Sequence, residues 1–200
     1  MIELFQQIAE VQPKLPGWCS ADKAATLAAL VIAQRPNVSL EIGIFGGSSF
    51  IPLALAHKAI GKGVVVGIEP WDKAAAIAAQ TTNEDRAWWD AQDLEGIYRT
   101  FMANLQHLGL ENVTRIIRKK SNDVEIPGAL GLAHIDGGHN DQAVTDVARV
   151  AHKVEIGGYI VLDDLGWHGG GVTRAAQRLT QMGFRSLYLI GTGAVYQRTR

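Results

Sequence analysis

Short apolar runs alternate along this chain with longer stretches of helical character, and this alternation constrains the fold more than any other feature. The most hydrophobic runs, such as VVVGI and YIVL, are continuous rather than alternating in polarity. Continuous apolar strands are typical of a sheet that is buried on both faces, and parallel neighbours in such a sheet need long crossovers, usually helices. The pattern therefore predicts βα units around a mostly parallel sheet.

The last two predicted strands differ from the others. Their sequences, FRSLYLIG and AVYQRTR, are separated only by a short turn at Thr192 and Gly193, which indicates an antiparallel hairpin. The other five strands are expected over residues 38–45, 63–71, 113–119, 130–137 and 157–165, and helices over 47–60, 84–108, 141–154 and 171–182. The predicted fold class is α/β: a Rossmann-like, seven-stranded, mostly parallel sheet with a C-terminal antiparallel hairpin and helices on both faces.

The length of 200 residues fits a single domain. We expect residues 1–37 to form a helical N-terminal cap, broken at LPGW, and residues 38–200 to form the Rossmann-like core. Two interpretations of the cap stay open, because it can either close over a cofactor site or simply cover the core.

Composition narrows the classes of partner. Nineteen basic and twenty acidic residues give a formal net charge of -1, so the chain has no general basic footprint for nucleic acid or for an anionic membrane. The longest nearly apolar run, residues 24–33, is far shorter than the ~20 residues that span a bilayer. A single cysteine and the lack of a secretory leader pattern favour a reducing cytoplasm. We expect a small-molecule substrate, no nucleic acid or membrane partner, and possible homo-oligomers.

The segment EIGIFGGSS follows the first predicted strand and opens a helix, where open α/β sheets bind ligands. A dinucleotide fingerprint needs a glycine two residues after the first one, and Phe45 occupies that position. The amino-acid end of S-adenosylmethionine fits better, because its small carboxylate suits the helix start and its cations suit an acidic neighbour. The expected cofactor contacts here are Glu41, Gly43, Phe45, Gly46, Gly47 and Ser48. Alternatively, the three glycines only permit tight packing between strand and helix.

Two further segments extend the predicted cofactor site. Glu69 ends the second strand beside the glycine loop, where a carboxylate can accept both ribose hydroxyls, although acidic residues at strand ends are often only solvated. Ser121 and Asn122 follow the third strand on the same edge and are expected to border the adenine.

Three carboxylates follow the fourth and fifth strands, which are expected to be neighbours about 4.8 Å apart. These are Asp136, Asp163 and Asp164, and Asp136 is also expected to border the cofactor. Such charges repel, so either their pKa values rise or a hard cation such as Mg²⁺ neutralises them. Because successive strand residues point to opposite faces, Asp163 and Asp164 can share an ion only if the strand breaks, which Gly166 makes plausible. Alternatively, one aspartate caps a helix and another is solvated.

His139 lies three residues beyond Asp136. Imidazoles titrate near neutrality, so this side chain is a candidate general base for a substrate hydroxyl. A surface or purely structural histidine is the alternative.

These motifs together resemble a known family. EIGIFGGSS, IEP, HIDGGHNDQAVTDVARV and GGYIVLDDLGW are similar to class I methyltransferases of the macrolide and aminocoumarin sugar O-methyltransferase group, and more distantly to catechol O-methyltransferases. The likeness runs from about residue 38 to residue 167. It implies Asp136, Asp163 and Asp164 as Mg²⁺ ligands and His139 as general base. Some relatives carry an acidic base at the position of Gly138, so the base assignment depends on His139 alone.

The expected function is S-adenosylmethionine-dependent, Mg²⁺-dependent O-methylation of a hydroxyl on a sugar, polyol or catechol-like molecule. Two alternatives remain at this point. One is a noncatalytic S-adenosylmethionine-binding module, and the other is a same-fold enzyme such as a nicotinamide oxidoreductase or a hydroxylase-like relative, since fold alone does not identify chemistry.

Overall fold

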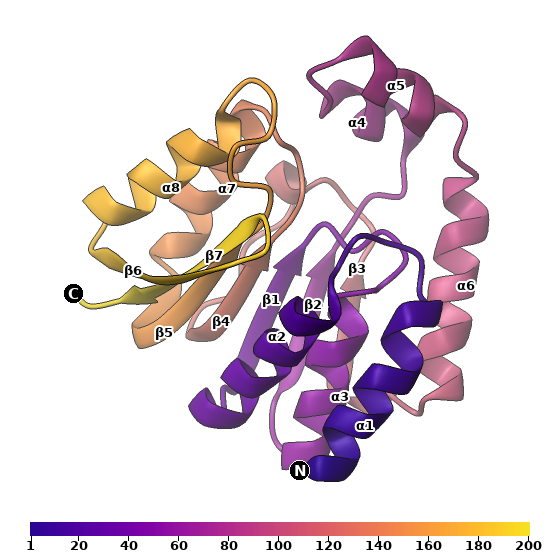
Figure 1. Cartoon of the computed structure of the whole chain (residues 1–200), viewed down its shortest axis with the longest axis vertical. Helices are drawn as coiled ribbons and strands as arrows, with labels where there is room; N and C mark the ends of the chain where they lie inside the picture. Colours follow the sequence, from indigo (N-terminus) through magenta and orange to yellow (C-terminus); the bar gives the residue numbers. More distant parts are fainter.

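The computed structural model describes all 200 residues and contains one seven-stranded sheet in the order β3-β2-β1-β4-β5-β7-β6 (Figure 1). Strands β1 to β5 pair in parallel, whereas β7 pairs antiparallel with both β5 and β6. The predicted fold class, a mostly parallel sheet with a C-terminal antiparallel hairpin, is confirmed. The strands are β1 (Val38–Ile42), β2 (Val64–Ile68), β3 (Thr114–Ile117), β4 (Leu130–Ile135), β5 (Val154–Leu162), β6 (Phe184–Ile190) and β7 (Gly193–Arg198).

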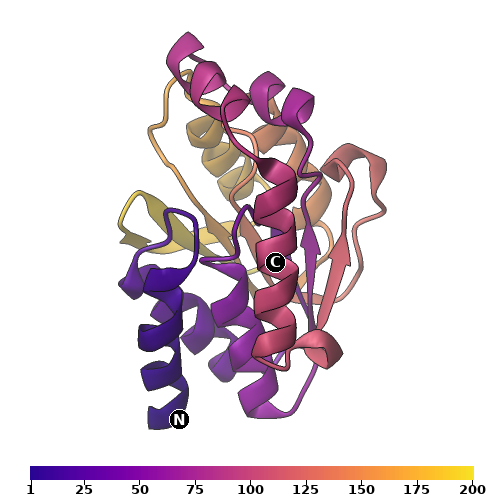
Figure 2. The same cartoon turned by 90° about the vertical axis from the view of Figure 1, so that its right-hand side faces the viewer.

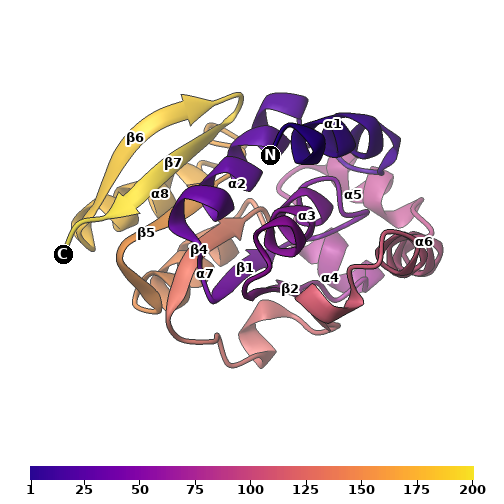
Figure 3. The ribbon, with the colours of Figure 1, turned by 90° about the horizontal axis from the view of Figure 1, so that it is seen from below.

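Helices cover both faces of the sheet (Figure 3). One face packs against α1 (Ile2–Val11), α2 (Ala21–Gln34), α3 (Phe50–Ile60) and α6 (Leu94–His107). The other face packs against α7 (Asp141–Ala151) and α8 (Gly171–Gln181). Every residue of β4 is buried, which explains why the central strands are continuous apolar runs.

Two short helices, α4 (Lys73–Ala78) and α5 (Asn83–Asp90), lie beyond the carboxyl ends of the strands (Figures 1 and 2). The predicted helix over residues 84–108 is wrong as one element, because the chain breaks after α5 and restarts at α6. The Asp93 side chain accepts the Gly96 N–H and so caps the second helix. The apolar spacing alone did not reveal this break, and α4 was not expected.

Strand β5 begins three residues earlier than the expected Gly157, and α7 ends correspondingly earlier than predicted. Gly157 has a φ of +85°, and the pairing of β4 with β5 shifts register between Leu130 and Leu132. This irregularity lets β5 continue through the Gly157-Gly158 pair, where the sequence predicted that the strand would begin.

The first 37 residues contain α1, a 3-10 turn at Gln12–Lys14 (η1) and α2. The LPGW segment lies between the two α-helices, and the Ser20 side chain accepts the Lys23 N–H to begin α2. No helix combines the length and the apolar character needed to cross a membrane.

Phe50 links the glycine-loop helix to the core, because its fully buried ring packs edge-to-face on Phe101 of α6 with centroids 5.6 Å apart. We expect Phe50→Ala to lower the free energy of unfolding by about 3–5 kcal/mol, since the lost contacts leave a cavity. The matched control is Ile156→Ala, whose side chain is 71% exposed, and which should change stability by about 0.5 kcal/mol or less. Guanidinium unfolding followed by circular dichroism measures both, and equal effects would contradict this account.

Candidate active site

A cavity of about 850 Å³ opens at the carboxyl edge of the sheet. The ends of β1, β2, β4 and β5 contribute to its wall, together with α4, α5 and the N-terminal segment. Of the predicted site residues, those that line it are Gly43, Phe45, Ser48, Glu69, Ser121, Asn122, Asp136, His139, Asp163 and Asp164. The predicted contacts Glu41, Gly46 and Gly47 lie outside this lining.

The glycines of the loop between β1 and α3 have separate physical roles. A Cβ on Gly43 would lie 2.1 Å from the Asp136 carbonyl oxygen, and its φ is +89°, so glycine is required where β1 and β4 end. A Cβ on Gly46 would lie 2.5 Å from Pro16 of the N-terminal segment, and one on Gly47 would lie 2.7 Å from the Phe101 ring. Close packing therefore explains Gly46 and Gly47 without a ligand.

Phe45 has the left-handed backbone conformation, with a φ of +49°. The Trp71 indole donates a 2.9 Å hydrogen bond to the Phe45 carbonyl and so helps hold this strained turn. The Phe45 ring stacks on Trp18 at 5.2 Å and meets Trp89 edge-on at 5.4 Å. With Trp88, these rings form an aromatic cluster that lines one side of the cavity.

Glu41 lies beneath the cavity and is fully buried in β1. Its Oε1 accepts a 2.6 Å hydrogen bond from the Ser49 hydroxyl and lies 3.6 Å from His134 Nδ1 of β4. Burial by itself lowers the pKa of His134, but Glu41 and the more distant Asp136 outweigh burial and raise it. The strand register, which places Glu41 beside His134, produces this buried pair.

Glu69 follows β2 and faces the glycine loop. Its carboxylate accepts backbone N–H groups from Ile44 at 3.2 Å and Trp71 at 3.1 Å. Burial raises the pKa of the Glu69 carboxyl, against the opposing effect of these two N–H donors. The side chain is thereby fixed in the cavity wall next to the loop, and the ribose contact stays a prediction.

Ser121 and Asn122 lie in a short 3-10 turn after β3, at Ser121–Asp123 (η3). Both contact Gln142 of α7: its amide donates to Ser121 Oγ at 3.2 Å and exchanges hydrogen bonds with the Asn122 amide at 2.9 and 3.0 Å. Gln142 also donates to Asp146. Gln142, which joins α7 to this end of the cavity, was not predicted from the sequence.

Asp136 follows β4, where its N–H donates to the Ile42 carbonyl at 2.8 Å. Burial and the neighbouring Asp163 raise the pKa of the Asp136 carboxyl well above its ordinary value, although His134 and Lys23 oppose them. The expected repulsion between carboxylates at the ends of β4 and β5 is therefore present in the electrostatics of the site.

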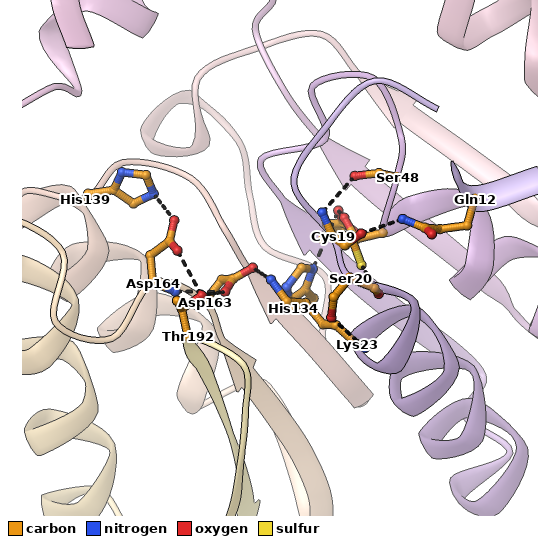
Figure 4. Close-up of polar contacts among 12 residues, drawn as sticks. Gln12, Cys19, Ser20, Lys23, Ser48, His134, His139, Asp163, Asp164 and Thr192 are labelled. Carbon is orange, nitrogen blue, oxygen red and sulfur yellow. Dashed lines mark hydrogen bonds and ion pairs between the residues drawn. The ribbon is translucent and has the colours of Figure 1, made fainter. Parts of the chain in front are cut away.

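Asp163 pairs with Lys23, a residue of α2, and both side chains are buried (Figure 4). Its other oxygen, Oδ1, accepts the Asp164 N–H at 2.8 Å and the Thr192 hydroxyl at 3.1 Å. Burial alone raises the pKa of Asp163, but His134 and Lys23 outweigh burial and lower it. Asp163 is therefore paired with a positively charged side chain, Lys23, of the chain itself.

Asp164 faces a different group from Asp163. The strand ends at Leu162, and Asp164 has a φ of +56°, so the backbone breaks as a shared site would require. Its Oδ2 lies 3.1 Å from His139 Nε2, and its Oδ1 lies 3.1 Å from the Thr192 hydroxyl, whose single proton is shared between Asp163 and Asp164 (Figure 4). The His139 ring packs against Trp167 with centroids 4.8 Å apart.

The side chains that could ligate a metal form two groups, each of which could hold a cation. Asp136, His139 and Asp164 place one ligand atom each within 4.8 Å of one another and line the cavity. The ligand atoms of His134, Asp136 and Asp163 also lie within 4.8 Å of one another, and of these only His134 lies outside the cavity lining. The carboxylates of Asp136 and Asp164 fit a divalent ion, whereas the third predicted ligand, Asp163, contacts Lys23.

Lys23 and Thr192 are the residues of this cluster that the sequence analysis did not identify. The sequence pattern does indicate a role for Lys23, because this residue shares the buried face of α2 with Leu27 and Val31 at helical spacing. A buried lysine needs a partner of opposite charge. Thr192 lies in the hairpin turn before β7 and had no comparable signal.

Comparisons with known proteins agree with this geometry. Residues 40–165 match the model of a family described as a methyltransferase domain. A comparison with curated protein sequences gives no match.

Similar solved structures share the fold at low sequence identity. The O-methyltransferase NovP is 16% identical with a TM-score of 0.70, covering 92% of this chain and 84% of its own. The O-methyltransferase TomG from Streptomyces achromogenes, in complex with S-adenosylmethionine, is 17% identical with a TM-score of 0.62, covering 99% and 90%. An rRNA methylase from Streptococcus thermophilus is 14% identical with a TM-score of 0.61, covering 92% and 98%. At these identities the likeness shows the fold alone.

Cys19, the chain's one cysteine, reports on the docking of the N-terminal segment. Burial raises the pKa of its thiol to about 12 from 9.0, so at pH 8 the thiolate fraction falls roughly 10³-fold. We expect an aromatic disulfide reagent to modify native Cys19 at least ~100-fold more slowly than the unfolded chain. As a control, Ser186→Cys in a Cys19→Ser background places an exposed thiol on β6 and should react fast in the native state. Equal native rates for the two thiols would overturn this prediction.

Proposed function

Since the chain belongs to the family of methyltransferase domains, we propose that it transfers the methyl group of S-adenosylmethionine to an oxygen atom of a small molecule. The observation that carries this proposal is the cavity of about 850 Å³, which joins the glycine loop, Glu69 and the acidic ends of β4 and β5. Its volume lies within the range of small-molecule sites. The sulfonium is already an activated donor, so the protein has to orient the reactants and control charge.

The cofactor would lie across the carboxyl edge, with its amino-acid end on the loop at Gly43 to Ser48 and its ribose at Glu69. The Glu69 carboxylate supports this placement, because two backbone N–H groups fix it and its remaining lone pairs can accept ribose hydroxyls. Ser121 and Asn122 would border the adenine. The fold neighbour TomG is described in complex with S-adenosylmethionine, which supports the same cofactor here.

His139 is the proposed general base for the acceptor hydroxyl. Its Nε2 lies 3.1 Å from the Asp164 carboxylate, which would orient the ring and stabilise the imidazolium. The nitrogen that would accept the proton is Nδ1, which has no hydrogen-bond partner within the protein. The ring also rests on Trp167, so its position at the cavity wall is defined by packing as well as by charge.

A divalent cation such as Mg²⁺ would be held by Asp136 and Asp164, and it would supply a positive charge that lowers the pKa of a bound hydroxyl. The raised pKa of Asp136 supports a need for positive charge at this point, because burial and Asp163 disfavour its ionised form.

The proposed acceptor is a sugar, polyol or catechol-like hydroxyl compound. The overall charge of -1 and the acidic end of the cavity disfavour a polyanionic acceptor such as RNA. The aromatic cluster of Trp18, Phe45, Trp88 and Trp89 offers flat apolar surfaces for a ring-bearing acceptor.

Calorimetry with S-adenosylhomocysteine and with NAD tests the cofactor assignment. We expect S-adenosylhomocysteine to bind and NAD not to bind, and the reverse result would reject the proposal. Glu69→Gln should weaken S-adenosylhomocysteine binding at least ~10-fold, because hydrogen bonds to a charged acceptor are worth about 1.5–3 kcal/mol. The control is Glu111→Gln, an exposed carboxylate near the amino end of β3, which should leave the affinity unchanged.

Methyl transfer tests the base assignment, measured as S-adenosylhomocysteine release with a panel of catechol, sugar and polyol acceptors. His139→Ala should lower kcat about 10²–10⁴-fold and leave S-adenosylhomocysteine affinity unchanged, because only the proton-transfer step loses its partner. His168→Ala, which removes an exposed histidine after β5, is the matched control and should retain full activity. A His139→Ala enzyme with normal kcat would exclude His139 as the base.

A further inference from the structure

Lys23 and Asp163 are 140 positions apart in sequence, yet their side chains form an ion pair in which both are almost fully buried, with relative exposures of 5% and 4%. Lys23 belongs to α2, outside the Rossmann-like core, and reaches the end of β5 across the cavity wall (Figure 4). Buried lysines are rare unless they are paired, because the ammonium loses its hydration.

The surroundings of Asp163 leave little room for a second cation. Lys23 occupies Oδ2, while the Asp164 N–H and the Thr192 hydroxyl occupy Oδ1. His134 lies on the buried side of the pair and is a further source of positive charge when protonated. Both oxygens of Asp163 are therefore engaged by donors that belong to the chain itself.

Asp136 and Asp164 differ from Asp163 in their partners. Both line the cavity within 4.8 Å of His139, and neither is paired with a lysine or arginine. All three carboxylates line the cavity, but only Asp163 is paired with a lysine of the chain itself.

We propose that Lys23 is a tethered cation that takes the place of a metal ion at Asp163, so that a divalent cation in this chain binds Asp136 and Asp164 but not Asp163. This inference rests on the cation proposed above, and it gives the reason why Asp163, the third carboxylate, is not a ligand. Its test is direct metal binding and does not depend on methyl transfer.

Mn²⁺ substitutes for Mg²⁺ at oxygen sites. Its binding to the protein can be measured from the loss of the electron paramagnetic resonance signal of the free ion. We expect Lys23→Met to bind Mn²⁺ at least ~10-fold more tightly than the wild type, because it frees a third carboxylate. In the wild-type background, Asp164→Asn should lower the affinity at least ~10-fold.

The matched control is the double variant Lys23→Met/Asp163→Asn, which removes both charges and should return Mn²⁺ affinity to the wild-type value. Thermal unfolding with and without Mn²⁺ gives an independent measurement, and Lys23→Met should gain more stability from the ion than the wild type does. If Lys23→Met does not fold, the comparison of the double variant with Asp164→Asn decides alone.

Two results would overturn the inference. One is an equal loss of Mn²⁺ affinity in Lys23→Met/Asp163→Asn and in Asp164→Asn, which would make Asp163 a ligand. The other is a folded Lys23→Met variant with unchanged or undetectable Mn²⁺ binding. Calorimetry with S-adenosylhomocysteine on the same wild-type protein separates these results from failure of the proposed function, because cofactor binding does not require the ion.

Discussion

Carboxylates at the ends of β4 and β5 are brought together by the parallel pairing of these strands, and the chain has to offset their repulsion. Asp136 and Asp163 lie directly after paired strand ends, where burial strengthens their interaction. Lys23 neutralises Asp163 within the protein. Breaking such a buried pair from one side costs about 3–5 kcal/mol, because the remaining charge stays desolvated. The position of α2 is therefore tied to the charge balance of the site.

The same N-terminal segment also shapes the glycine loop. Pro16 packs on Gly46 so closely that no Cβ fits there, and the Ser48 hydroxyl accepts the Cys19 N–H at 3.4 Å. The loop conformation proposed to receive the amino-acid end of the cofactor thus depends on a segment that comes earlier in the chain than the sheet. Cofactor binding and docking of this segment should consequently stabilise each other, since both favour the same loop conformation.

The sequence predicted the sheet, its hairpin and the edge at which the site lies, because these follow from hydrophobic period and from the rule that parallel strands share their carboxyl ends. That rule placed Glu69, Asp136 and His139 along one cavity. It did not distinguish glycines that are required by packing, such as Gly46, from glycines expected to approach a ligand, because the residue type is the same in both cases. It also did not find the Lys23 partner, since the docking of α2 depends on tertiary contacts for which its own pattern gives only a buried face.

Two parts of the cavity are built in different ways. The part proposed to hold the cofactor consists of strand termini and tight loops, such as Glu69 held by backbone N–H groups, so the sheet register fixes its geometry. The aromatic side of the cavity comes from Trp18 and the tryptophans of α5, which lie outside the sheet and contact one another. Trp18 is 67% exposed and Trp88 is 42% exposed, so these side chains contribute less to the core than the buried residues beneath them. Substitutions in that cluster can therefore alter the surface proposed to meet an acceptor while the register that shapes the proposed cofactor site stays intact.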